Sequence, residues 1–431
     1  MKNKVLVIGS GGREHALAWR LSQSSTVEHV FVAPGNAGTS AEDNVSNIAI
    51  NPQDFNALIQ FCQKENIDLV VVGPEQPLCE GIVDEMSKQG INCFGPSAKA
   101  AQLEGSKVYS KQFLQKYAIP TARYASFTDI DKALDYLAKQ TLPIVIKADG
   151  LAAGKGVVIA QTQQQAQATI NDMLAGNAFG EAGHRIVIEE FLQGEEASFI
   201  VMVDGENFLA MATSQDHKAR DNGDLGPNTG GMGAYSPAPV VTDEIHQEVI
   251  QSIIKPTIKG MQAEGAKFVG FLYAGLMIDA QGKAKVLEYN VRFGDPETQP
   301  IMLRLQSNLD ELCLAAIKGK LDKMSISWDE KVALGVVMAE KGYPDNYTKG
   351  SEITGIEAAN NLKDCKVFHA GTDLKNDKII TNGGRVLCVC ALADDLKTAQ
   401  KNAYLAVDKI HWNSKYYRTD IGFKALINPA A

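Results

Sequence analysis

The first hundred residues alternate between short apolar runs and segments with helical spacing. Residues 4–9 form an apolar run that ends in glycine, and residues 14–22 follow with apolar positions three and four apart. The same order returns at 28–35, in the amphipathic segment 54–65 and at 67–74. Strand, turn and helix in repeated succession predict an open α/β sheet. The ligand of such a sheet is expected at the carboxyl ends of its strands.

The pattern changes after this sheet. A helical stretch ends at Ile119-Pro120, and alternating strands then predict a compact α+β unit over 121–192. From about 193 to 325, short strands and two helices carry most of the polar motifs. The last hundred residues return to strand and turn patterns, including 332–340 and 383–390. The chain is therefore predicted to be a multidomain protein with clefts between its units.

Composition narrows the classes of function. The 431 residues are 45% hydrophobic and 22% charged, which is enough apolar material for several cores. With 42 basic and 51 acidic residues, a net charge of −9 and no basic stripe, nucleic acid is a poor candidate partner. No apolar segment approaches the roughly 20 residues that span a bilayer. The seven scattered cysteines fit a reduced cytoplasm.

A glycine-rich turn follows the first apolar run. Gly9, Gly11 and Gly12 lie between a predicted strand and helix, where backbone amides hold phosphate well. A nicotinamide-dependent oxidoreductase is one alternative, but Glu14 occupies the third glycine position and the second strand ends in Ala33-Pro34-Gly35, without an acid for a ribose. A generic tight turn is the other alternative. The pattern favours a site for a phosphate smaller than NAD.

A second glycine-rich segment, 147–156, follows another apolar run. It resembles a P-loop, but it has three residues between Gly150 and Gly154 and a glycine after Lys155. Its glycines and two lysines suit a mobile flap over a triphosphate. A solvent-exposed hairpin is the alternative.

Residues 286–293 alternate strictly. Glu288, Asn290 and Arg292 are predicted on one face of a strand, where carboxylate and amide oxygens suit Mg²⁺ and a guanidinium can stabilise a transferring phosphoryl group. A solvated sheet edge is the alternative, and the acidic segment 294–297 weakens it. The residues expected on the core face are Leu287, Tyr289, Val291 and Phe293.

The polar segment 213–236 is too long and too polar for a simple connection, which favours a binding loop over a plain surface loop. Within it, His217 stands between Asp216 and Lys218. These side chains are candidate polar contacts, and nothing in the sequence marks His217 as a general base.

Taken together, these segments resemble the phosphoribosylamine–glycine ligase (glycinamide ribonucleotide synthetase) family of the ATP-grasp superfamily. The resemblance runs nearly end to end. The matching segments are 9–16, 72–78, 94–96, 103–107, 146–157, 189–196, 226–237, 287–297 and 367–372.

The resemblance implies a mixed α/β and α+β ATP-grasp fold. Its parts would be a Rossmann-like N-terminal domain (1–103) that binds phosphoribosylamine, a central domain (104–120 and 193–325), a mobile lid (121–192) and a C-terminal mixed α/β domain (326–431).

The resemblance also implies the site. Lys107 and Lys147 would meet phosphates and base, with Glu189, Glu190 and Leu192 as the adenine hinge and Glu196 on the ribose. The flap residues assigned to the nucleotide are Gly154, Lys155 and Gly156. Glu288 and Asn290 would bind Mg²⁺ or Mn²⁺. Gly9, Gly11, Gly12 and Glu75 would hold the phosphoribosyl group. The reaction centre would contain His217, Asn228, Thr229 and Gly230, with Asp216, Lys218 and Arg292 as catalytic residues.

The implied activity is ligation of glycine to 5-phosphoribosylamine with ATP as co-substrate, by a cytoplasmic monomer of purine biosynthesis. Two positions depart from the family pattern. In the family, Lys-Arg usually comes directly after Asp-His, whereas here the order is Lys218-Ala219-Arg220, which leaves the role of Arg220 open. The second departure is Ser307-Asn308-Leu309, where Ser-Asp-Leu is usual. Another ATP-grasp ligase and a non-catalytic nucleotide sensor are the remaining alternatives.

Overall fold

The computed structural model describes residues 2–151, 156–175 and 184–427. The N-terminal part is a parallel sheet in the order β3-β2-β1-β4-β5. Its strands are β1 (Asn3–Gly9), β2 (Val27–Pro34), β3 (Val45–Asn47), β4 (Leu69–Val72) and β5 (Cys93–Phe94). Its helices are α1 (Gly12–Ser22), α2 (Phe55–Glu65), α3 (Glu75–Glu80), α4 (Ile82–Lys88) and α5 (Ala98–Gly105). The predicted succession of strands and helices in this part is confirmed.

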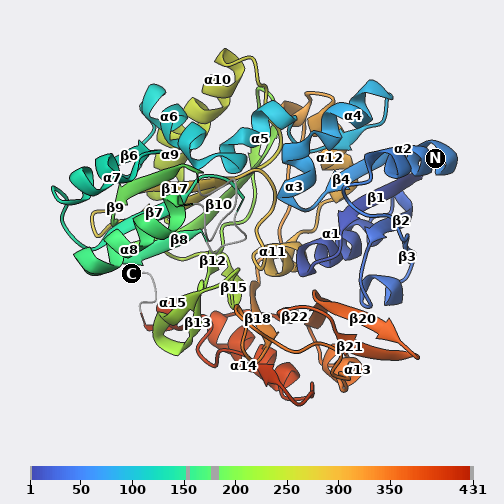
Figure 1. Cartoon of the computed structure of the whole chain (residues 1–431). Coiled ribbons are helices and arrows are strands. Elements are labelled where there is room, and N and C mark those ends of the chain that lie inside the picture. Colours follow the sequence, from blue (N-terminus) through green and yellow to red (C-terminus); the bar gives the residue numbers. More distant parts are fainter. Residues whose placement is uncertain (1, 152–155, 176–183, 428–431) are drawn as a thin grey trace.

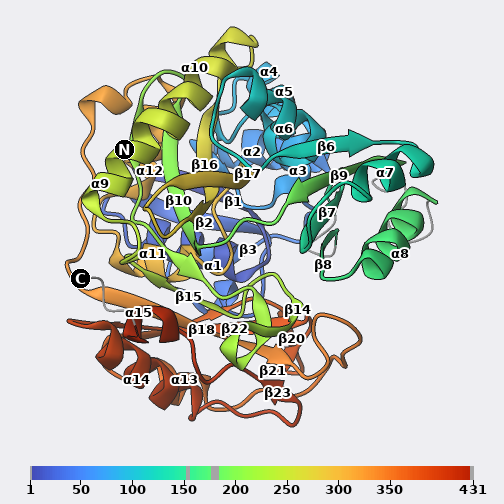
Figure 2. The same ribbon diagram turned by 90° about the vertical axis from the view of Figure 1, so that its left-hand side faces the viewer.

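Helix α6 (Lys107–Lys116) packs in a core shared with the N-terminal and central parts, and a sheet in the order β6-β9-β7-β8 follows it. The strands are β6 (Tyr124–Phe127), β7 (Ile144–Ala148), β8 (Val157–Ala160) and β9 (Ile186–Glu190). Helices α7 (Ile130–Leu137) and α8 (Gln163–Leu174) pack on this sheet and share a core with it. That core is separate from the others, and the unit stands apart at the left of Figure 1 and the right of Figure 2.

The central part is an antiparallel sheet in the order β11-β10-β16-β17. Its strands are β10 (Glu195–Asp204), β11 (Phe208–Ala210), β16 (Val269–Ile278) and β17 (Ala284–Asn290). The helices that follow or connect them are α9 (Asp243–Val249), α10 (Lys255–Ala263), α11 (Thr298–Arg304) and α12 (Leu309–Ile317). Apolar residues of this sheet share two cores with the N-terminal sheet, so these two parts form one packed body.

The C-terminal part lies below the others in Figure 1. Its sheet has the order β12-β15-β18-β22-β19, and β23 also pairs with β18. The strands are β12 (Gln215–Asp216), β15 (Gly233–Ser236), β18 (Val332–Glu340), β19 (Cys365–His369), β22 (Arg385–Ala393) and β23 (Lys415–Tyr416). Its helices are α13 (Ile356–Asn360), α14 (Leu396–Val407) and α15 (Phe423–Ile427). Two hairpins complete it, β13 (Ala219–Asp221) with β14 (Leu225–Asn228) and β20 (Thr372–Lys375) with β21 (Lys378–Thr381).

The polar segment 213–236 therefore joins two parts of the molecule. Its strands β12 and β15 pair into the C-terminal sheet, with Ala234 opposite Gly335 of β18, although the segment precedes much of the central sheet in sequence. Within the described residues, no helix is both long enough and apolar enough to cross a membrane.

Candidate active site

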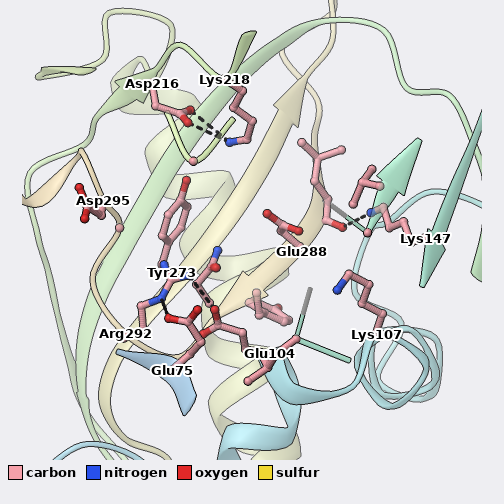
Figure 3. Close-up of a pocket in the computed structure, with 18 of the residues that line it drawn as sticks. Glu75, Glu104, Lys107, Lys147, Asp216, Lys218, Tyr273, Glu288, Arg292 and Asp295 are labelled. Carbon is pink, nitrogen blue, oxygen red and sulfur yellow. Dashed lines mark hydrogen bonds and ion pairs between the residues drawn. The ribbon is translucent and has the colours of Figure 1, made fainter. Parts of the chain in front are cut away.

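A cavity of about 380 Å³ lies between these parts, and Figure 3 shows a portion of its wall. Its charged lining residues are Arg13, Glu75, Glu104, Lys107, Lys111, Lys147, Glu189, Asp216, Lys218, Glu288, Arg292, Asp295, Glu297 and Arg385. Glu75 lies three residues beyond the carboxyl end of β4, so the N-terminal sheet turns its ligand-binding edge toward the cavity.

At one end of the cavity, two lysines hold the buried carboxylate of Glu189. Lys147 Nζ on β7 lies 3.0 Å from Glu189 Oε1 and donates to the Leu287 carbonyl at 3.1 Å. Lys111 Nζ on α6 lies 2.8 Å from Glu189 Oε2. Burial lowers the pKa of Lys111 to about 8, although Glu189 opposes that shift. The Glu189 side chain is therefore committed to the lysines, and its part in an adenine hinge stays a prediction.

Lys107 and Lys111 share one face of α6 because they are four residues apart. Lys107 Nζ donates to the Gly150 carbonyl at 2.9 Å, at the start of the predicted flap. Gly156, at the other end of that segment, also lines the cavity. The sequence singled out Lys107 and missed Lys111, for which the spacing was the available signal. The predicted flap residues Gly154 and Lys155 lie outside the described residues.

Strand β17 departs from strict alternation. Glu288 pairs with Gly275 of β16, whereas Val286 pairs with the very next residue of that strand, so Leu287 is the extra residue of a β-bulge. Leu287 consequently lines the cavity, and Val286 takes the buried position. The prediction that Leu287 packs in the core is wrong, because a bulge leaves no mark in the apolar pattern.

Glu288 and Asn290 both line the cavity, and in Figure 3 the Glu288 carboxylate points toward its open centre. Their oxygens are hard donors of the kind Mg²⁺ and Mn²⁺ accept. Among the described residues, no cluster of three or more His, Cys, Asp or Glu side chains could enclose an ion. Two protein oxygens suit a metal whose other ligands are water and substrate phosphates, so the residues fit the implied ion.

Arg292 is half-buried between two carboxylates. Its Nη2 lies 2.7 Å from Glu104 Oε1 and its Nε lies 3.2 Å from Glu75 Oε2. Burial by itself raises the pKa of Glu75, but Arg292 and Arg13 outweigh it and lower that pKa to about 2. Burial dominates at Glu104 and raises its pKa to about 7. The pair of acids fixes the guanidinium at the cavity wall.

A second cation lies on the opposite wall, as Figure 3 shows. Lys218 Nζ lies 3.2 Å and 3.1 Å from the two carboxylate oxygens of Asp216, and 3.3 Å from Glu196 Oε2. Thr229 and Gly230 line the cavity beside this group. The structure therefore brings together four of the residues predicted for the reaction centre: Asp216, Lys218, Thr229 and Gly230.

The first glycine-rich turn is packed around a side chain. The Gly11 amide donates to Glu14 Oε2 at 2.6 Å, and a Cβ at Gly9, where φ is +129°, would lie 2.4 Å from Glu14 Cγ. A Cβ at Gly12 would lie 2.5 Å from Gln299 Nε2. None of these three glycines is among the residues that line the cavity, whereas the adjacent Arg13 is.

Several predicted site residues lie elsewhere. Glu190 pairs with Arg123 at 2.7 Å on the exterior, and neither it nor Leu192 lines the cavity. His217 is buried beneath the wall, where its Nε2 accepts from the Gly422 amide at 3.1 Å and burial lowers its pKa to about 4. Asn228 is exposed on β14. The departure at Arg220 is local, since this side chain pairs with the adjacent Asp221 at 2.8 Å.

Residues that the sequence did not single out complete the wall. Tyr273 donates to Glu297 Oε1 at 2.7 Å beside Lys218, while Tyr343 and Arg385 reach the cavity from the C-terminal part. They stand far from the recognised motifs in sequence, so no local pattern indicated them.

An acid-bearing strand facing lysines from a separate small sheet is the arrangement of an ATP-grasp enzyme. The chain belongs to the phosphoribosylglycinamide synthetase family, whose N domain matches residues 3–104, whose ATP-grasp (A) domain matches 105–298 and whose C domain matches 333–424. This membership removes the nicotinamide-dependent oxidoreductase from consideration.

Curated relatives match over nearly their whole length. Phosphoribosylamine–glycine ligase of Escherichia coli strain K12 is 61% identical over 424 residues, 98% of this chain and 99% of the relative. The Vibrio cholerae protein of the same name is 58% identical over 428 residues, 99% of this chain and 100% of the relative.

Solved structures agree with the fold. Phosphoribosylamine–glycine ligase from Thermotoga maritima has a TM-score of 0.83 and 34% identity, covering 97% of this chain and 100% of that one. Biotin carboxylase from Campylobacter jejuni has a TM-score of 0.74 at 14% identity, covering 100% and 96%, and shows the shared fold alone.

Proposed function

We propose that this protein joins glycine to 5-phosphoribosylamine at the expense of ATP, giving glycinamide ribonucleotide, ADP and phosphate in cytoplasmic purine (IMP) biosynthesis. The observation that carries the proposal is one cavity lined by Lys107 and Lys147, by Glu288 and by Lys218, in a chain that matches this ligase family from end to end. The carboxyl edge of the N-terminal sheet opens on the same cavity, which supports a place there for the phosphoribosyl group.

The reaction has two steps. A carboxylate oxygen of glycine attacks the γ-phosphorus of ATP, and the bond to ADP breaks with its electrons leaving on ADP. The amine nitrogen of phosphoribosylamine then attacks the acyl carbon of glycyl phosphate, phosphate leaves with the bonding pair, and the amine loses a proton. Transfer of a phosphoryl group depends mainly on position and charge, which the protein supplies.

The residues divide this work by position. Lys107 and Lys147 hold the nucleotide phosphates, with Lys111 and Glu189 fixing the Lys147 ammonium. Glu288 and Asn290 would bind Mg²⁺ or Mn²⁺, which supplies neutralisation of phosphate charge when bound. Arg292, held by two acids, offers its remaining N–H groups to the transferring phosphoryl group.

On the other wall, Asp216 orients Lys218, and Lys218 stabilises the carboxylate and the acyl phosphate. Because glycyl phosphate hydrolyses readily, the site must exclude water. We assign this task to residues 121–192, whose separate core permits movement as a lid.

An omission assay tests the function. ADP and phosphate are measured with glycine, phosphoribosylamine, ATP and divalent metal present, and then with each one left out. We expect release at full rate only in the complete mixture, together with the mass of glycinamide ribonucleotide. Equal ADP release without glycine, or release supported equally by bicarbonate in its place, would overturn the proposal.

A further inference from the structure

The C-terminal part reaches the cavity through two side chains that hold the backbone of Gly230. The Gly230 amide donates to the Tyr343 hydroxyl at 3.0 Å, and Arg385 Nη1 donates to the Gly230 carbonyl at 2.6 Å. Both backbone polar groups of Gly230, its N–H and its carbonyl, therefore have hydrogen-bond partners more than a hundred positions away in sequence. A Cβ at Gly230 would lie 3.0 Å from Arg385 Cζ, so the contact requires a close backbone approach.

Arg385 also holds the turn that follows β17. Its Nη1 donates to the Asp295 carbonyl at 2.7 Å, and its Nη2 lies 3.3 Å from Asp295 Oδ2. Gly231 packs against the same turn, because a Cβ there would lie 2.4 Å from Pro296 Cδ. The guanidinium thus bridges two segments of the wall, with Nη1 on the Gly230 and Asp295 carbonyls and Nη2 beside the Asp295 carboxylate.

The segment held in this way adjoins the cationic wall. The Thr229 amide and its hydroxyl both donate to the Lys218 carbonyl at 2.8 Å, and the Gly231 amide donates to Thr229 Oγ1 at 2.9 Å. A displacement of Gly230 would consequently be transmitted to Lys218 and would open this side of the cavity to water. The nucleotide lysines stand on other elements, α6 and β7, and take no part in the contact.

We propose that Arg385 and Tyr343 are positioning residues that clamp Gly230 against the Asp295 turn and so couple ATP cleavage to amide formation. The proposal rests on the proposed function. With the clamp loosened, glycyl phosphate still forms, but water adds to its acyl carbon, the bond from that carbon to the phosphate oxygen breaks, and glycine, phosphate and a proton are released. ATP is then consumed without product.

The test is the ratio of ADP to glycinamide ribonucleotide formed by Arg385→Lys and Tyr343→Phe. We expect a ratio near one in the parent protein and of at least about two in Arg385→Lys, because the acyl phosphate partitions to water. Product turnover should fall about tenfold, or ~1.4 kcal/mol, with the KM for ATP within about twofold. Tyr343→Phe should shift the ratio in the same direction by less.

Tyr404→Phe is the matched control, since the Tyr404 hydroxyl bonds only within the C-terminal part, donating to the Arg418 carbonyl at 2.8 Å. Its ratio should stay near one. If ADP and product fall in parallel in both clamp variants, so that the ratio stays near one, the clamp has only a structural role and the inference is overturned. Failure of the proposed function is a different result, since the parent protein itself would then release no glycine-dependent ADP.

Discussion

Glu288 shows how a half-buried acid is kept charged in this site. Burial raises its pKa, but Lys147, Lys218, Lys107 and Arg292 outweigh burial and lower it. A carboxylate held ionised beside the nucleotide lysines can share a metal with the phosphates. We predict that Glu288→Gln, which keeps shape and removes charge, lowers turnover by roughly two to three powers of ten.

The fold should survive that change, because Tyr289 and Val291 still fill the core beneath the strand. Steady-state kinetics over a range of Mg²⁺ concentrations, with thermal unfolding on the same sample, measure both effects. Glu206→Gln, which removes an exposed acid paired with Lys267, is the matched control. Normal turnover and normal metal dependence in Glu288→Gln would place the metal elsewhere.

The buried side chain of His369 makes the stability of the protein depend on pH. Burial, with help from the nearby His15, lowers its pKa to about 3 from an ordinary value of 6.5. Between these two pH values His369 is protonated in the unfolded chain and neutral in the folded chain. The free energy of unfolding therefore decreases as the pH falls from 6.5 toward 3.

We predict that His369→Gln makes the free energy of unfolding less steep in pH over this window, by up to about 1.4 kcal/mol per pH unit. Urea unfolding at pH 7, 6, 5 and 4 measures the slope for both proteins. Parallel curves would mean that His369 takes up its proton without a cost in stability.

At the scale of elements, the turn between β1 and α1 is built to hold Glu14. We predict that Gly9→Ala destabilises the protein by about 2 kcal/mol or more, because the new Cβ meets both a strained φ and the Glu14 side chain. Gly90→Ala is the control, since φ there is +72° with nothing within 4 Å of a Cβ, and strain alone costs about 1 kcal/mol. Equal losses in thermal unfolding would show that the Glu14 contact relaxes freely.

The periodicity of the sequence predicted helices and strands correctly more often than it predicted what surrounds each side chain. The strand at β1 and the helix at α2 followed from spacing alone, since burial dictates both patterns. The sheet face on which Leu287 lies could not be predicted from spacing, because the pairing of β17 with β16 determines the position of the bulge. Nor could the pairing of β15 with β18, which depends on a partner about a hundred residues away.

At the scale of the molecule, the cavity wall is assembled from parts that are distant in sequence. Motif residues such as Lys147, Glu288 and Lys218 could be recognised because their chemistry is concentrated in short segments. Arg385 and Tyr343 could not, since each stands in an ordinary apolar or turn context and reaches the cavity only through packing of the C-terminal sheet. The burial of His217 likewise could not be predicted, because it depends on Phe423 of α15, whose ring lies against the imidazole.

The central claim is that glycine is activated as an acyl phosphate before the amine attacks. Turnover with glycine labelled with ¹⁸O in both carboxylate oxygens tests it most directly, by mass spectrometry of the phosphate released. We expect one ¹⁸O in inorganic phosphate for each glycinamide ribonucleotide formed, because the bridging oxygen of glycyl phosphate comes from glycine and leaves with phosphorus. Unlabelled phosphate alongside normal product would contradict it.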